Sequence, residues 1–289
     1  AIAVVHGGSP YVSAYAWSGS GFGSKYANPT NLPPSTGRSV AFSAVGDTQL
    51  VYTNYAAVAH NGSPYVTAYT WSGAGWGSKF SNPSTLPAQE SYSVSFADDG
   101  SAIAVAHKSS PFVTAYPWSG SGFGSKFSNP STLPSNDAYA VAFSPDGSAI
   151  AVGHSGGSNV STYPWSGSGF GSKYSNPSTP PGSTGAGLDF SPDGAALAVA
   201  HSGSPFISAY AWSGSGFGSK FSNPSTLPTG YANGVAFSPD GAAIAVAHYQ
   251  NPRVSVYPWS GSGFGTKFAN PSTLPTGTGR GVAFSPNGS

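Results

Sequence analysis

Hydrophobic and polar positions alternate along this chain in a pattern that returns every 47 residues. In the unit that starts at Ala138, four short runs have the alternation that is typical of β-strands: residues 140–144, 149–154, 159–165 and 170–175. Between the runs lie residues 145–147 (PDG) and 166–169 (SGSG), whose Pro and Gly suit the dihedral angles of tight hairpins. Each unit is therefore predicted to be a four-stranded antiparallel meander.

The second run of each unit indicates how neighbouring units pack. In residues 102–107 (AIAVAH), Ile, Val and His fall on one face of the predicted strand and three Ala on the other. Neither face is polar, so both should be covered by protein, the large face of one sheet meeting the small face of the next. Sheets stacked radially in this way form a β-propeller, for which four to eight blades is usual. The predicted fold class is all-β, a six-bladed β-propeller of four-stranded antiparallel blades.

Histidine and tryptophan mark the repeat along the whole chain. One His occurs in each unit: His6, His60, His107, His154, His201 and His248. One Trp follows at the same interval: Trp17, Trp71, Trp118, Trp165, Trp212 and Trp259. Six units of 47 residues and one insertion of seven account for all 289 residues, and the spacing places the insertion within residues 43–55. Residues 1–289 are therefore expected to form a single domain.

The two ends of the sequence complement each other. The chain begins with AIAVVH, which matches the second strand of a unit, and ends with GVAFSPNGS, which matches a first strand and its turn. Joined, they would form one hairpin. We expect the C-terminal strand to pair with the N-terminal strand and close the ring, which removes the free sheet edges that an open array would expose.

Composition narrows the classes of function. Only 7% of the residues are charged, the net charge is +1 and no basic run occurs, so nucleic acid and anionic membranes are poor candidate partners. No apolar run approaches the roughly 20 residues that span a bilayer. The absence of Cys removes thiolate metal sites and thiol redox chemistry. We expect a monomer that needs no metal or other cofactor.

A motif at the first two runs of each unit resembles a known superfamily. It is clearest in residues 141–152 (VAFSPDGSAIAV) and 235–246 (VAFSPDGAAIAV), and it is similar to the signature of WD-repeat and YVTN-type propellers. The resemblance covers all six units and implies a binding platform rather than one particular activity. Trp-Ser-Gly replaces the Trp-Asp of WD repeats, so the WD hydrogen-bond network is not carried over. The WSGSGFGSKFSNPSTLP segment is similar to repeats of uncharacterised bacteriophage structural proteins, which implies a virion-associated or extracellular protein.

Comparison of the six units separates a constant end of the ring from a variable one. In a meander, the turns after the first and third strands lie at one end, and the loops after the second and fourth strands lie at the other. The SPDG and SGSG turns barely change, whereas the loops at the other end differ among units. The candidate ligand-binding residues at this variable end are Arg38, Tyr92, Lys108, Tyr139, Tyr231, Tyr249, Arg253 and Arg280.

These residue types favour a non-catalytic module that binds a macromolecule or a glycan through its variable end. Tyr and Arg combine a large contact area with directed hydrogen bonds. Neutral drift in loops that carry no packing load is the alternative explanation of the variation. A second functional hypothesis is a repeat lectin, in which aromatic pairs such as Trp118 and Phe123 stack on sugar rings at up to six equivalent sites. Cross-strand aromatic pairing is the simpler account of those pairs.

Other repeated side chains have structural explanations. The six His lie one per unit among core Ile and Val, so they cannot converge on one metal ion at ligand distances of about 2 Å, and packed, hydrogen-bonded His is expected. The repeated Lys of the fourth run suits protection of an exposed edge strand, with an anion site as the alternative. Pro117, Pro164 and Pro258 remove a donor within the third strand, and a bulge is expected there.

No catalytic constellation is evident, and an enzyme is not expected. Paired carboxylates would be the first requirement of a glycoside hydrolase, but most Asp residues belong to turns. Asp189 is unusual because it replaces Ala or Ser in a first strand, nearest the central channel. Desolvation should raise its pKa there. A lone carboxylate does not supply acid and base together.

Overall fold

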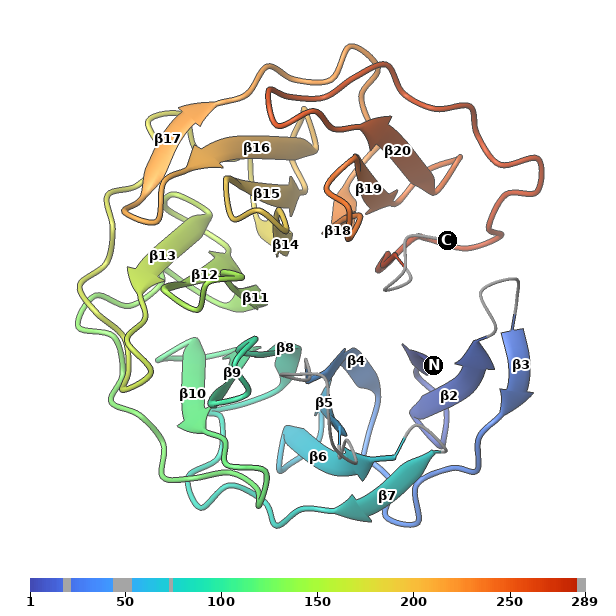
Figure 1. Ribbon diagram of the computed structural model, residues 1–289, viewed down its shortest axis with the longest axis vertical. Helices are drawn as coiled ribbons and strands as arrows, with labels where there is room; N and C mark the ends of the chain where they lie inside the picture. The colour runs from blue at the N-terminus through green and yellow to red at the C-terminus, as the bar shows by residue number, and fades with distance from the viewer. Residues whose placement is uncertain (18–21, 44–53, 73–74, 285–289) are drawn as a thin grey trace.

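The computed structural model describes residues 1–17, 22–43, 54–72 and 75–284. These ranges contain twenty β-strands and no helix. In the described residues there is accordingly no helix that could span a membrane. The strands form six antiparallel sheets that are arranged around a common centre (Figure 1). The structure is thus all-β and propeller-like, as the repeat predicted. The insertion predicted within residues 43–55 lies largely in 44–53, outside the described residues.

Each sheet, called a blade below, has the same order from the centre of the ring outward. The innermost strands are β4 (Gly37–Phe42), β8 (Ser91–Phe96), β11 (Ala138–Phe143), β14 (Gly185–Phe190) and β18 (Ala232–Phe237). The second strands are β1 (Ile2–Val5), β5 (Asn54–His60), β9 (Ala102–His107), β12 (Ala149–His154), β15 (Ala196–His201) and β19 (Ala243–His248). The third strands are β2 (Val12–Trp17), β6 (Val66–Trp71), β10 (Val113–Pro117), β13 (Val160–Pro164), β16 (Ile207–Trp212) and β20 (Val254–Pro258). The regular fourth strands are β3 (Phe22–Lys25), β7 (Trp76–Lys79) and β17 (Phe217–Lys220).

The core lies between blades, where a face of small residues meets a face of large ones. Every residue of β9 and of β12 is buried. One continuous cluster joins Ala102 and Ala104 of β9 to Ile150 and Val152 of β12. This confirms the predicted packing of the Ala face against the Ile and Val face.

Proline explains why only three blades have a regular fourth strand in the described ranges. In those blades the residue before the final Trp of the third strand is Ala or Thr, whereas in the other three it is Pro117, Pro164 or Pro258. Pro has no N–H to donate to the neighbouring strand, and the outer segment there keeps one isolated bridge, as between Trp118 and Phe123. Among the described residues, all four predicted strands are therefore present in two blades, β4 to β7 and β14 to β17.

The prediction of a bulge at these prolines was wrong. The pairing of β9 with β10 continues without a shift to Pro117, which lies opposite Ala102. The side of the third strand that faces the second strand is undisturbed, and the loss falls on the outer side. The physical reason is that Pro removes a single N–H, which affects only one of the two neighbouring strands.

The last described segment lies where a further innermost strand would be. Residues 279–284 are not assigned to a strand, and no hydrogen bond joins them to β1 among the described residues. The Gly279 amide nevertheless donates to the His248 carbonyl oxygen (3.1 Å), just as the Gly37 amide of β4 donates to that of His6 (3.2 Å). The N-terminus and the last described residues lie on either side of one junction of the ring (Figure 1). The strand pairing predicted to close the ring is not seen.

Candidate functional site

The ring has two different ends, which we call the turn face and the loop face. The turn face carries the turns that follow the first and third strands of each blade. The loop face carries the loops that follow the second strands and the segments that lead into the first strands. At the loop face these two kinds of segment are joined by backbone hydrogen bonds, such as Lys108 N to Glu90 O (3.0 Å) and Tyr249 N to Tyr231 O (2.8 Å). Lys108, Tyr231, Tyr249 and Arg253 lie in these segments, and the other predicted residues, Arg38, Tyr92, Tyr139 and Arg280, lie at the start of an innermost strand or in the last described segment.

Three of the predicted residues are placed by a β-bulge in the innermost strands. In β11, Ala138 pairs with His154 and Ala140 with Gly153, so Tyr139 is an extra residue on its strand. Arg38 in β4 and Tyr92 in β8 occupy the same bulged position. A bulge changes the direction of a side chain relative to the regular strand. The second residue of these innermost strands is therefore not part of the regular strand pairing. Alternation of hydrophobic and polar residues does not reveal this bulge.

Arg38, Tyr92 and Tyr139 form a stack across three consecutive blades, which we call the central stack. The Arg38 Cζ atom lies 5.5 Å from the centre of the Tyr92 ring, which is cation–π distance. The rings of Tyr92 and Tyr139 have centroids 4.9 Å apart and a tilt of 39°. The Arg38 Nε atom also donates to Asn61 Oδ1 (2.7 Å). Asn61 was not among the predicted residues.

Two carboxylates adjoin the central stack. The Tyr92 hydroxyl donates to Glu90 Oε2 (3.4 Å), and Lys108 Nζ lies 3.9 Å from Glu90 Oε1. Burial, followed by the charge of Glu90, raises the pKa of Tyr92. Burial, followed by the charge of Asp137, raises the pKa of Tyr139. Both phenols therefore keep their protons at neutral pH; the proton of Tyr92 is donated to Glu90, whereas Tyr139 can donate a hydrogen bond to a ligand.

A second group, on the blade of β18 to β20, consists of Tyr231, Tyr249 and Arg253. The Tyr rings have centroids 6.2 Å apart with a tilt of 42°, and 58% of Tyr231 and 53% of Tyr249 are exposed. The Arg253 guanidinium donates to the carbonyl oxygen of Tyr249. Arg280 is exposed on the last segment, and no described contact joins it to this group or to the central stack. The structure thus places six of the eight predicted residues in two groups of three, with Lys108 beside Glu90 and Arg280 apart from both groups.

The loops after the second strands share two backbone hydrogen bonds although their side chains differ. In the loop after β9, His107 N donates to Phe112 O (2.9 Å) and Phe112 N to Ser109 O (2.8 Å), and the corresponding bonds occur in all six loops. The residue five positions after each His has a positive φ: Tyr11, Tyr65, Phe112, Asn159, Phe206 and Arg253. Backbone hydrogen bonds therefore fix these loops and leave several of their side chains free to vary.

The repeated His side chains belong to the framework. His107 is fully buried, and its Nε2 atom is 2.8 Å from Thr114 Oγ1. His154, His201 and His248 make the same contact with a Ser. Burial lowers the pKa of His201 to about 4, so this imidazole is neutral in the folded protein. This confirms packed, hydrogen-bonded His at these four positions, whereas His60 is buried with no described partner for either ring nitrogen, contrary to the prediction.

The aromatic pairs considered for sugar stacking are packed inside the blades. Trp118 is 4% exposed and makes edge contacts with Phe123 of its own hairpin and with Phe80 and Tyr55 of the preceding blade. The faces of the indole are covered by these rings. The geometry fits cross-strand aromatic pairing within a core that extends between blades.

Asp189 joins two innermost strands. Its Oδ2 atom on β14 accepts a hydrogen bond from the backbone N–H of Phe237 on β18 (2.7 Å). Burial raises the pKa of Asp189 to about 7, in the direction expected from the sequence. Its single acceptor contact with the neighbouring blade gives it a structural role, which the sequence did not indicate.

The loop face offers phenol donors, carboxylate acceptors, guanidinium groups and exposed ring faces, a combination suited to reversible binding. Within the described ranges no group of three His, Asp or Glu side chains is arranged to hold a metal ion. Neither a known protein-family model nor a curated protein sequence matches the chain.

Proposed function

We propose that the protein is a non-catalytic binding module whose loop face recognises a macromolecular or glycan partner. One observation carries the proposal: the side chains of the loop face change from blade to blade while its backbone hydrogen bonds stay the same. Arg and Tyr side chains that differ between repeats gather into the central stack and into the group of Tyr231, Tyr249 and Arg253.

The chemistry of the two groups supports recognition. Tyr and Arg are enriched among the residues that dominate binding energies, because each combines a large apolar or planar surface with hydrogen-bonding groups. The stacking of Arg38 on Tyr92 and of Tyr92 on Tyr139 restricts these side chains before a partner arrives. Restricted side chains lose less conformational entropy on binding.

We also infer that the finished ring closes, with residues 281–284 as the innermost strand beside β1 and with four strands in each blade. One close approach of the last segment supports this, and it repeats an approach between two earlier blades. A Cβ atom on Gly234 of β18 would come within 3.0 Å of Gly281 Cα, much as one on Gly187 of β14 would come within 2.8 Å of Gly234 Cα. Closure would bring Arg280, which occupies the same repeat position as Arg38, to the blade next to Arg38 and extend the central stack.

The test replaces Tyr92, Tyr139 and Tyr231 by Ala together and measures binding to a glycan array and to a phage-displayed peptide library. Partners found with the unaltered protein should lose at least tenfold in affinity. The matched control replaces Ser168, Ser215 and Ser262, exposed serines of the turn face, by Ala and should bind as before. Unchanged binding by the triple Tyr variant would reject the proposal.

Two further hypotheses stay predictions. A repeat lectin with up to six equivalent sites predicts that glycan binding survives the triple Tyr substitution. The similarity to bacteriophage structural proteins predicts that the protein is found on virus particles, which antibody labelling of particles can test.

A further inference from the structure

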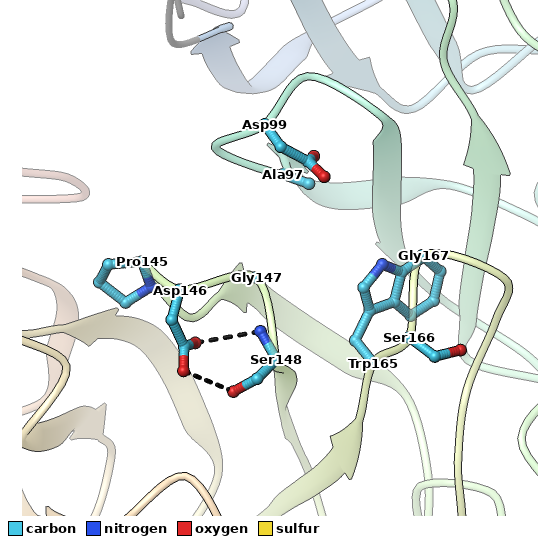
Figure 2. A pocket seen from close by; sticks show the side chains of 9 residues that line it. All are labelled: Ala97, Asp99, Pro145, Asp146, Gly147, Ser148, Trp165, Ser166 and Gly167. Atoms are coloured by element: carbon cyan, nitrogen blue, oxygen red, sulfur yellow. Dashed lines mark hydrogen bonds between the residues drawn. The ribbon is translucent and has the colours of Figure 1, made fainter.

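A pocket of about 360 Å³ lies on the turn face, between the blade of β9 and the blade of β12. Figure 2 shows its lining, which comes from the first turn of each blade and from the turn that follows β13. The residues are Ala97, Asp99, Pro145, Asp146, Gly147, Ser148, Trp165, Ser166 and Gly167. None of them belongs to the loop face.

The indole of Trp165 brings an unused hydrogen-bond donor to this pocket. Trp165 is only 5% exposed, and its Nε1 atom is itself buried and has no hydrogen-bond partner within the described structure, so a ligand reaches this donor only if the lining shifts. Figure 2 shows the nitrogen edge of the ring turned toward the space between the two aspartate turns. Because a buried N–H without an acceptor costs free energy, a ligand that supplies an acceptor would be favoured here.

Two carboxylates at the rim of the pocket are held by their own turns. Asp146 Oδ1 accepts hydrogen bonds from Ser144 Oγ (2.6 Å) and Ser148 N (3.0 Å), and Oδ2 accepts one from Ser148 Oγ (2.7 Å). These bonds lower the pKa of Asp146, so it is ionised at neutral pH. Asp99 Oδ1 accepts from the amide and the hydroxyl of Ser101 (2.9 and 2.7 Å). No described residue donates to Asp99 Oδ2, so that oxygen is available to a ligand.

We propose that this pocket binds an uncharged, hydroxyl-rich ligand of the sugar class. A hydroxyl group can accept from the Trp165 N–H and donate its one proton to an oxygen of Asp99 or Asp146, and a second hydroxyl of the same sugar can donate to the other carboxylate. An ammonium group has no acceptor for the indole, and an anion would be repelled by the two carboxylates. The apolar surfaces of Ala97 and Pro145 complete the lining and suit the C–H groups of a pyranose ring.

This site differs from stacking on the Trp and Phe pairs, because it uses the edge of the indole and not its covered faces. The two turn aspartates and the Trp of this pocket recur 47 residues further along the chain as Asp146, Asp193 and Trp212. The Trp212 Nε1 atom also has no described partner. Ser148 is replaced there by Ala195, so the pocket beside Trp165 has one more hydroxyl group.

Saturation-transfer NMR and titration with the methyl glycosides of glucose, galactose, mannose, N-acetylglucosamine and fucose test the proposal. We expect at least one glycoside to bind, and Trp165→Phe and Asp99→Asn each to weaken it about tenfold. Phe keeps the aromatic packing without the N–H, and Asn keeps an oxygen for Ser101. The matched control is Trp76→Phe, because Trp76 also has an unpartnered indole nitrogen but does not line this pocket. The affinity of this variant for the glycoside should be unchanged.

Three results would overturn the proposal. The first is that no glycoside binds, and the second is that both pocket variants bind as tightly as the unaltered protein. The third is that Ca²⁺ alone binds in an Asp99-dependent way while the glycosides do not. The triple Tyr variant of the loop face should bind the glycoside normally, which separates failure of this site from failure of the proposed function.

Discussion

The turn face and the loop face are both built from short connections between strands, but different groups hold them in shape. On the turn face side chains hold the backbone: Ser144 Oγ accepts from Ala149 N (2.9 Å) and donates to Asp146, and Ser191 and Ser238 repeat this pattern. Backbone bonds close the connections of both faces, as from His107 N to Phe112 O and from Ser144 N to Ala149 O (both 2.9 Å), so the repeated side-chain bonds are what the turn face adds.

This difference explains where the repeats vary. A side chain that fixes a turn cannot be replaced without loss of its hydrogen bonds, so the SPDG sequence recurs. A loop that is fixed by its own N–H and C=O groups tolerates other side chains. The variable end of the ring is therefore able to acquire binding residues without loss of the fold.

The largest expected effect is a different response of the two faces to acid. Burial lowers the pKa of His107, His154 and His248, and lowers it to about 4 for His60 and His201, whereas an unfolded His titrates near 6.5. Below pH 6.5 the unfolded chain binds more protons, so stability falls as the pH drops toward 4. Each of these two His contributes up to about 3 kcal/mol to the loss. The turn aspartates, such as Asp146, have a lowered pKa, and their contribution is lost only below about pH 4.

Urea unfolding at pH 7.5 and pH 4.5, with amide hydrogen exchange of both faces, measures this difference. The free energy of unfolding should fall by several kcal/mol, and exchange should rise first in the loops that follow the second strands. Asp189 acts in the opposite sense, because its raised pKa of about 7 makes stability fall as the pH rises from about 4 to 7. The His outnumber it, so equal stability at the two pH values would contradict the assignment of neutral, buried His.

A smaller effect is expected from Ser144→Ala on the turn face. The substitution removes the acceptor of Ala149 N and the donor to Asp146, and should cost about 1–2 kcal/mol of unfolding free energy. The control is Lys108→Ala on the loop face, where a surface substitution should change stability by less than about 0.5 kcal/mol. Thermal and urea unfolding of both variants provide the measurement. Equal effects would mean that the two faces are not held in different ways.

The strand positions and the two ends of the ring followed from the sequence because both depend on local patterns. Alternation places a strand, and Pro and Gly place a turn, whatever surrounds them. The number of strands in each blade depends on one N–H that is lost at Pro117, Pro164 and Pro258. The sequence showed the loss, but not the side of the strand on which it would act.

The candidate site was predicted as an end of the ring and not as a set of contacts. Tyr92 and Tyr139 are 47 residues apart, which already indicates equal positions in adjacent blades. That the two rings stack depends on the bulge in the innermost strands, which alternation alone does not reveal. The free indole nitrogen of Trp165 depends on the absence of any acceptor nearby, a property of three-dimensional packing that has no signal in the sequence.

The smallest effect on stability is expected from Arg253→Gly, which separates the backbone of the loop face from its side chains. Arg253 has a φ of 74°, a conformation that Gly adopts at no steric cost. Its backbone N–H to Gln250 and its carbonyl to His248 are kept in the variant, whereas the guanidinium contact with Tyr249 is lost. Relief of strain and loss of that contact should nearly cancel, within about 0.5 kcal/mol. Affinity for any partner that uses this group should fall at least tenfold, and a matched Arg253→Lys variant should retain part of it. Marked destabilisation by Gly would show that the side chain of Arg253, and not the backbone, holds this loop.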